Sequence, residues 1–345
     1  SGTITGTITG QPIGASASGP IEAAMVSVDP FHGVYTDANG NFTLQNVPTG
    51  TATLKVIPYG TGILTKNTPI TVVSGTNNLG TIDLGAGVTQ VGVILGETNS
   101  EFGLRQIEGN ITPYGYTVTD SQTTAVKLAG ASARQTNTAG SYIYFDVDPG
   151  WLYRGKIGNA GLTVTDPGLS TQLIPKLAPD MYVQIEYLDR GTDAFNINFN
   201  MNEKTTNNGF DSIRLTNPYA SGNGAIGTGT GNYVTKTNTN QWKTFTYYLN
   251  PAAGNNFGAY DGQNLQADFR ISARNDGQRE AIHAVILSIT PTITPLPGPA
   301  TGTDILKVYG GLKAGPLTTS SLWASYDLNG DGTIDLKDAV KAANP

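Results

Sequence analysis

The sequence predicts a mainly-β protein in which two β-domains precede a small helical tail. Apolar and polar residues alternate over short runs such as Ala194–Asn200, which is the pattern of strands with one buried and one solvent-exposed face. Turn-forming residues separate these runs, and glycine alone contributes 44 of the 345 residues. Charged residues make up 13% of the chain, about half the proportion of a typical soluble protein. A chain of this length can form two or three domains, each with its own core.

Residues 1–86 predict the first β-domain. Its expected strands are short alternating runs, namely Ala23–Val28, Phe42–Leu44, Thr51–Val56 and Ile70–Val72. The residues Asp37-Ala-Asn39-Gly40 supply the positive φ angles of a tight hairpin turn. The stretch Val34–Thr51, with its TDANGNF and VPTG runs, resembles the carboxypeptidase-regulatory-like module, a transthyretin-type, Ig-like β-sandwich. This resemblance implies a non-catalytic spacer or interaction domain.

The opening residues 1–10 predict a strand that is open to two interpretations. Ile4, Gly6 and Ile8 fall on one side of this strand and threonines on the other. A loose connection of about ten small residues follows, which is long for a hairpin. The strand either pairs within its own domain or is a donor strand that completes the sandwich of the next subunit, with Ile4 and Ile8 as its anchors. Head-to-tail donation does not close on itself, so it would produce a filament of identical chains.

Residues 87–290 predict a second, larger β-domain. Its expected strands include Tyr142–Asp148, Met181–Tyr187, Ala194–Asn200, Trp242–Tyr247, Asp268–Ile271 and Ala281–Ile289. These runs resemble galactose-binding-like jelly rolls of secreted bacterial proteins, which implies a jelly-roll fold that often binds carbohydrate. The candidate glycan contacts are the aromatic residues Trp151, Tyr153, Trp242 and Tyr260. Because aromatic residues of a β-sandwich more often lie in its core, core packing is the alternative for each of them.

No set of residues in the sequence predicts catalysis. The two histidines are His32, in a turn, and His283, in an expected strand where a hydrogen-bonded core residue is more common than a general base. Several acids could be interpreted as a glycosidase pair, although turn acids or calcium ligands are the better interpretation; these acids are Asp146, Asp148, Glu186, Asp189 and Asp193. We therefore assign no catalytic residue and predict a protein that is not an enzyme.

A proline- and threonine-rich linker at 291–303 leads into a tail, 304–345, that contains a calcium-loop sequence. Oxygen-bearing side chains occupy loop positions 1, 3, 5, 7, 9 and 12, which are Asp327, Asn329, Asp331, Thr333, Asp335 and Asp338. Ca²⁺ takes six to eight oxygen ligands, so this spacing predicts Ca²⁺ as the cofactor. The loop and the segment after it resemble a dockerin repeat, which implies a small helical unit. Dockerins carry two such loops, and the ligands of the first are missing here, which counts against a cohesin partner.

The overall composition excludes several classes of protein. The chain has no cysteine, which removes thiol chemistry and disulfides and suits an exported bacterial protein. Its net charge of −6 and pI near 4.9 argue against a nucleic-acid partner. No apolar run approaches the about 20 residues of a membrane span. We expect an extracellular or cell-surface protein whose signal peptide has been removed, with Asn41 and Asn110 in N-glycosylation sequons.

These expectations favour a structural role. The primary prediction is a non-catalytic subunit of a bacterial, pilus-like surface fibre that assembles by donation of the first strand, so that its main partner is another copy of itself. The alternative is a carbohydrate-binding accessory protein of a polysaccharide-degrading, dockerin-type system, whose partner is a glycan.

Overall fold

The computed structural model describes residues 1–108, 121–138, 141–151, 181–199, 233–249, 267–273 and 279–296, together with three two-residue strands at 219–220, 317–318 and 333–334. Every regular element in this part of the chain is a β-strand, so the predicted mainly-β fold is confirmed. The chain divides into two compact units, Ser1–Ile293 and Thr294–Pro345. The described residues contain no helix long and apolar enough to cross a membrane.

The second unit is described only through two short strands. These are β22 (Leu317–Thr318) and β23 (Thr333–Ile334), which pair antiparallel with Leu317 opposite Ile334. The predicted helical segment of the tail lies outside the described residues, so it stays a prediction.

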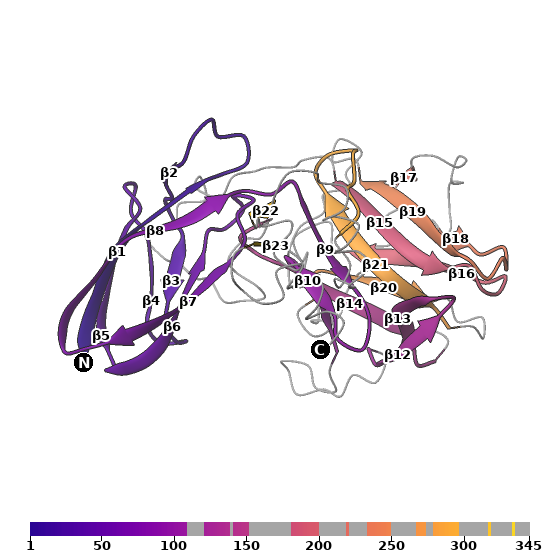
Figure 1. The fold of residues 1–345 in the computed structure, drawn as a ribbon, viewed down its shortest axis with the longest axis horizontal. Helices are drawn as coiled ribbons and strands as arrows, with labels where there is room; N and C mark the ends of the chain where they lie inside the picture. Colours follow the sequence, from indigo (N-terminus) through magenta and orange to yellow (C-terminus); the bar gives the residue numbers. More distant parts are fainter. Residues whose placement is uncertain are drawn as a thin grey trace, which may run out of the picture. The chain divides into compact units, whose positions relative to one another are not determined.

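Two four-stranded sheets enclose the first hydrophobic core, and their strands are drawn in indigo to purple in Figure 1. One sheet contains β1 (Gly2–Gln11), β2 (Gly19–Pro20), β5 (Asn41–Val47) and β8 (Gly75–Ala86). The other has the order β4 (Gly33–Tyr35), β3 (Met25–Ser27), β6 (Gly50–Ile57) and β7 (Lys66–Val72). Alternate residues of these strands point inward, and the side chains of Leu44, Leu54 and Val56 are almost completely buried. Removal of this apolar surface from water stabilises the sandwich.

The opening strand β1 is the central strand of its sheet and pairs within its own chain. It runs antiparallel to β5, with Ile4 opposite Leu44, and parallel to β8, with Ile8 opposite Ile82. Ile4 and Ile8 are both 0% exposed. A Cβ added to Gly6, which lies between them, would meet the Phe42 ring at 2.9 Å, so the close approach requires glycine. The side of β1 that was predicted to anchor a donated strand therefore packs into its own sandwich in this chain.

Two of the outer strands of this sandwich, β7 and β8, carry features that oppose further pairing. Pro69 lies within β7 and has no N–H to donate to another strand. The pairing of β8 with β1 is interrupted by two register shifts, and Gly80 and Gly85 in β8 have φ angles of 65° and 81°. Bulges and edge prolines prevent sheets of neighbouring molecules from joining edge to edge. Assembly by simple addition of strands to these edges is therefore disfavoured.

Two larger sheets enclose the second core. The first has the order β10 (Ser100–Phe102), β9 (Gln90–Ile94), β21 (Ala281–Ser288), β15 (Met181–Leu188), β19 (Trp242–Leu249) and β17 (Tyr219–Ala220), and the hairpin of β12 (Thr123–Leu128) and β13 (Ala131–Thr136) joins it at β21. The second has the order β11 (Leu104–Ile107), β14 (Tyr142–Val147), β20 (Phe269–Ala273), β16 (Ala194–Phe199) and β18 (Val234–Thr235). Between them, Phe145 stacks on Phe269 with ring centroids 4.9 Å apart. Two sheets packed face to face are consistent with the predicted β-domain of jelly-roll type.

Candidate functional site

The four aromatic residues predicted to contact a glycan do not share one environment. Trp151 is 2% exposed, belongs to the second core, and donates its indole N–H to Val88 O at 2.6 Å. This burial fits the core alternative and not contact with a ligand. Trp242 is partly exposed at the start of β19. Tyr153 and Tyr260 lie outside the described residues.

Trp242 belongs to a continuous outward-facing surface on two neighbouring strands. β19 pairs antiparallel with β15 from Met181 to Leu188, and alternate residues of both strands point away from the core. We call this surface the ladder face, and its residues are Tyr182, Gln184, Glu186, Trp242, Thr244, Thr246 and Tyr248. The intervening residues Val183, Ile185 and Tyr247 are 0% exposed in the core. At about 3.3 Å per residue, the face extends about 20 Å from Tyr182 to the end of β15.

One end of the ladder face carries a tyrosine pair and the middle carries an amide. The rings of Tyr182 and Tyr248 stack across the two strands with centroids 4.9 Å apart and an interplanar angle of 21°. Next along the strands, Gln184 Nε2 donates to Thr246 Oγ1 at 3.2 Å. An aromatic pair at this end of the face is therefore followed by an amide and a hydroxyl group.

Trp242 lies at the other end of the ladder face, where contacts with neighbouring residues fix its position. Its indole N–H donates to Leu128 O in the β12–β13 hairpin at 3.1 Å, and its ring centroid lies 5.6 Å from that of His283. His283 in turn contacts Ser132 O through Nδ1 at 2.5 Å and lies 3.9 Å from Glu186 Oε2 through Nε2. Glu186 is the one carboxylate among the seven residues of the ladder face, and His283 lies beside it. The surface therefore suits a ligand that is polar and uncharged.

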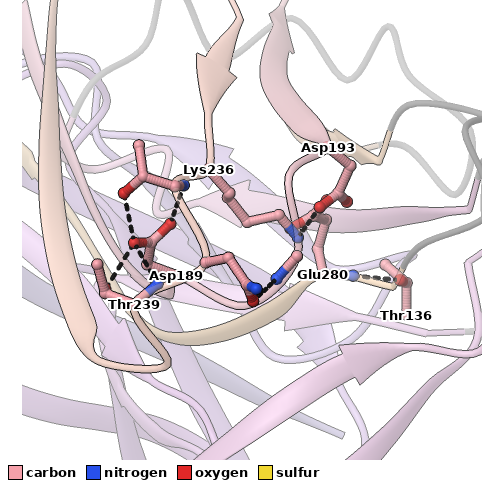
Figure 2. Close-up of polar contacts among 9 residues, drawn as sticks. Thr136, Asp189, Asp193, Lys236, Thr239 and Glu280 are labelled. Atoms are coloured by element: carbon pink, nitrogen blue, oxygen red, sulfur yellow. Dashed lines mark hydrogen bonds and ion pairs between the residues drawn. The ribbon is translucent and has the colours of Figure 1, made fainter.

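Asp189 follows β15 and fixes the segment that leads into Trp242 (Figure 2). Its side chain is 0% exposed and accepts hydrogen bonds from the backbone N–H and hydroxyl groups of Thr237 and Thr239, at 2.6 to 3.1 Å. It also lies 2.6 Å from Lys243 Nζ. Burial by itself raises the pKa of Asp189, but the hydrogen bonds from Lys243, Thr239 and Thr237 outweigh it and hold the pKa far below its ordinary value. Asp189 is thus ionised at neutral pH and has a structural role.

A second cluster lies beside it in the interior and brings together three ionisable side chains (Figure 2). Lys236 Nζ is 2.7 Å from Asp193 Oδ1 and 2.9 Å from Glu280 Oε2, and the three side chains are between 1% and 3% exposed. Both oxygens of Asp193 and Oε1 of Glu280 have no hydrogen-bond partner among the other described residues, so these oxygens bond only to each other. Burial, opposed by the Lys236 charge and reinforced by the Asp193 carboxyl, raises the pKa of Glu280 to about 8. Glu280 therefore holds a proton at neutral pH.

The remaining acids and the second histidine make structural contacts. Asp148 accepts hydrogen bonds from the N–H and hydroxyl of Thr65 and from Gly150 N, which ties a loop of the first sandwich to a loop of the second within one unit. Asp146 pairs with Arg105 at 2.7 Å. His32 contacts the Asp29 carboxylate in its own turn at 2.7 Å. None of these groups forms a pair of acids around a cavity, and the prediction that the protein is not an enzyme stays a prediction.

The predicted calcium ligands lie outside the described residues, except that Thr333 begins β23. No group of three or more potential metal-ligating side chains occurs within the described ranges, which leaves the tail loop untested. Of the two sequon residues, Asn41 is exposed on β5 and accepts a hydrogen bond from Thr7 Oγ1. Asn110 lies outside the described residues.

Comparison with known proteins leaves the family open. No protein-family model matches the sequence, and no curated protein matches it. Two solved cohesin–X–dockerin complexes from Acetivibrio cellulolyticus, both interface mutants, have TM-scores of 0.20 and 22% and 26% sequence identity. Each match covers 24% of this chain and 53% of that chain, so the chain spans about half the length of these proteins. A candidate carbohydrate binding protein from Bacteroides uniformis has a TM-score of 0.18 and 9% identity, over 83% of this chain and 98% of that chain. With TM-scores this low, none of these likenesses assigns a function.

Proposed function

We propose that the chain is a non-catalytic, extracellular carbohydrate-binding protein whose ladder face binds an uncharged glycan. The observation that supports this proposal is the composition of that face, where aromatic rings at both ends flank an amide and hydroxyl groups in the middle. Sugar rings have apolar C–H surfaces that pack on aromatic residues, and their hydroxyls pair with amide and hydroxyl groups. The strands of a packed sheet hold these groups in place before a ligand arrives, which lowers the entropy cost of binding.

The decisive variants remove side chains of the ladder face without disturbing the core. Loss of the indole in Trp242→Ala should weaken glycan binding about tenfold, because one aromatic contact contributes about 1.4 kcal/mol. Gln184→Ala should weaken binding by a smaller factor. Glycan arrays identify the ligand, and titration calorimetry then measures each variant against it.

A matched control uses an aromatic residue on the other sheet. Tyr142 lies on β14, where the Arg270 guanidinium sits 3.5 Å from its ring centroid. Tyr142→Ala should leave glycan affinity unchanged, and thermal unfolding of all variants checks that they are folded. A wild-type protein that binds no neutral glycan on the array, or a Trp242→Ala variant with undiminished affinity, would contradict the proposal.

Fibre assembly is the second candidate function, and one feature of the chain favours it. Residues 14–18, which follow β1, are all exposed, so this connection could extend and let β1 enter a second copy. Such an exchange would rebuild the same β1 contacts between two chains at little cost. Since β1 lies in its own sandwich here, the fibre stays a prediction, and the Ile8 variants discussed below bear on it.

We also propose that Ca²⁺ binds the tail loop and stabilises the second unit. Four carboxylates from Asp327, Asp331, Asp335 and Asp338 repel one another unless a cation lies among them. At a Ca²⁺ concentration about 100 times the dissociation constant, binding stabilises the loaded unit by about 2.7 kcal/mol. Trypsin should therefore cleave after Lys337 and Lys341 faster in a chelator than in Ca²⁺, as peptide mass spectrometry measures. Equal cleavage rates in the wild type, with no change in Asp331→Ala, would count against a calcium site.

A further inference from the structure

The cluster of Lys236, Asp193 and Glu280 has a composition that salt bridging alone does not explain. Two acids share one base in an interior where all three side chains are at least nine-tenths buried. Buried polar groups normally have all their hydrogen-bonding capacity satisfied, yet the Asp193 oxygens and Oε1 of Glu280 have no hydrogen-bond partner outside this cluster among the described residues, and these oxygens bond only to each other. The Lys236 ammonium approaches Asp193 Oδ1 to 2.7 Å without forming a hydrogen bond of good geometry to it. The arrangement is better suited to a reaction between these groups than to a stable ion pair.

The backbone fixes this approach. Asp193 and Lys236 face each other across the β16–β18 pair, one step beyond Ala194 and Thr235, and Lys236 N donates to Asp193 O at 2.8 Å. Both side chains point to the same face as the buried residues Phe195 and Val234. Glu280 arrives from the other sheet immediately before β21, and its backbone is held there by two hydrogen bonds with Thr136.

We propose that Lys236 and Asp193 form an intramolecular isopeptide bond, an amide between Nζ of Lys236 and Cγ of Asp193, with Glu280 as the group that transfers the protons. The proposal rests on the short distances among the three buried side chains and on the register of β16 with β18. It is independent of glycan binding and of fibre assembly, since it needs only the second β-domain to be folded.

The reaction conserves atoms and needs no oxidant, reductant or cofactor. A proton moves from the Lys236 ammonium to the Asp193 carboxylate, which leaves a neutral amine beside a neutral carboxylic acid, a combination that a low-dielectric interior favours over two ions. Nζ then attacks Cγ and forms the C–N bond. Glu280 accepts a proton from the nitrogen and gives one to the departing hydroxyl, so that the C–O bond breaks and one water molecule leaves.

The site supplies three conditions that favour this condensation over the same reaction in free solution: proximity of the reacting groups, a proton-transfer group and exclusion of water. Reacting atoms held at about 3–3.5 Å gain the advantage of high effective concentration, and the ladder register keeps amine and carboxyl together permanently. Proton transfer is efficient when the transferring group titrates near the working pH. Burial of Glu280 moves its pKa into that range. Exclusion of bulk water also protects the product amide from hydrolysis.

The Lys243–Asp189 pair is an internal control for this assignment. Its Nζ and Oδ2 atoms are 2.6 Å apart, closer than the proposed reacting pair, but the Lys243 side chain is 36% exposed. The Asp189 oxygens are occupied by four hydrogen bonds from Thr237 and Thr239, and no third acid contacts Lys243 among the described residues. We expect this pair to remain ionic, since proximity alone is insufficient.

Such a bond would give this cysteine-free chain a covalent staple. It would close a loop between residues 193 and 236 and join β16 to β18, the two-residue strand at the end of its sheet. A cross-link restricts the unfolded chain much as a disulfide does, but without sensitivity to reducing agents.

Intact-mass spectrometry of the purified, denatured full chain tests the proposal directly. The expected mass is lower than that of the sequence by one water molecule. After trypsin digestion, peptide 191–204 should be joined to peptide 215–243, because a linked Lys236 is not cleaved, whereas cleavage after Lys243 should be normal. A full sequence mass would overturn the proposal, and so would a link to the peptide that contains Glu280 instead of Asp193.

Variants separate the role of each residue. Lys236→Arg and Asp193→Ala should both restore the full mass. Glu280→Gln keeps the shape of the side chain but cannot transfer protons in the same way, and should leave at least most molecules unlinked. Asp193→Asn should release ammonia in place of water if it reacts, which changes the mass loss accordingly. A linked Glu280→Gln protein would exclude Glu280 from the reaction. The mass of the wild-type protein alone decides whether the bond exists, so the test does not depend on whether each variant folds.

Discussion

Asp189→Ala is expected to lower the free energy of unfolding of the second β-domain by about 3–5 kcal/mol. The substitution removes one fully buried carboxylate and leaves the Thr237 and Thr239 N–H groups and hydroxyls without their acceptor. Lys243 is partly exposed and can return to water, so most of the loss comes from the threonine segment. Urea unfolding followed by tryptophan fluorescence measures the change. Glycan affinity should fall as well, because this segment leads directly into Trp242.

Asp37→Ala is a suitable control for this prediction. Asp37 also accepts hydrogen bonds from backbone N–H groups of its own turn, from Asn39 and Asn41, but it is exposed to solvent. Water can replace its carboxylate, so the substitution should destabilise the protein far less. An equal loss of stability in the two variants would show that burial of Asp189 is not the cause.

The pH dependence provides a second measurement on Asp189. Its pKa in the folded protein is held well below the about 3.9 of an unfolded aspartate, so the folded state binds this proton more weakly. The contribution of Asp189 is therefore fully present above about pH 4 and is lost as the pH falls toward the folded-state pKa. Asp189→Asn should remove this acid-dependent part of the stability, and the stability difference between wild type and variant should shrink in strong acid.

The sequence predicted the fold well because the signals for it are local. Alternation in Ala194–Asn200 and in Met181–Tyr187 placed one face of each strand in the core, and the structure buries Phe195, Ile197, Val183 and Ile185 as this pattern requires. The solvent-exposed face predicted for Ala194–Asn200 is wrong where the structure describes it, because Ala194 and Asn196 are also buried. The pairing of the strands could not be predicted from such local signals. The parallel pairing of β1 with β8 joins residues more than 70 positions apart, and only packing of the whole sandwich selects it.

The candidate sites were only partly predictable. Trp242 was chosen as an aromatic residue, but its place on the ladder face depends on its pairing with β15. Lys236 was missed, although a local signal existed. Lys236 follows Val234 by two residues, so its side chain is expected on the same, buried face of the strand. Asp193 precedes Phe195 by two residues and is expected on the buried face of its strand for the same reason. A charged residue in the apolar phase of a strand indicates a buried partner, whereas the identity of that partner requires the tertiary structure.

Ile8→Ala is expected to lower the stability of the first sandwich by about 2–5 kcal/mol. The Ile8 side chain is 0% exposed at the centre of the first core, so its removal loses apolar burial and leaves a cavity that close packing cannot fill. Ile8→Val should cost only about 0.5–1.5 kcal/mol. Ile82→Ala is the matched control, because Ile82 lies opposite Ile8 on β8 but is partly exposed. Calorimetric unfolding should show Ile8→Ala as less stable than Ile82→Ala and Ile8→Val, and all three variants as less stable than the wild type.

The same variants distinguish the two arrangements of β1. If β1 stays in its own sandwich, wild type and Ile8→Ala are both monomers by light scattering at every concentration and differ only in stability. If β1 is exchanged between copies, the wild type forms filaments in electron micrographs, and Ile8→Ala shortens or abolishes them because the anchor that fills the neighbour's core is gone. Filaments that persist unchanged in Ile8→Ala and after removal of residues 1–10 would exclude β1 as the connecting strand. Since the bulges and Pro69 oppose pairing at β8 and β7, assembly would then have to use a surface other than these two edges.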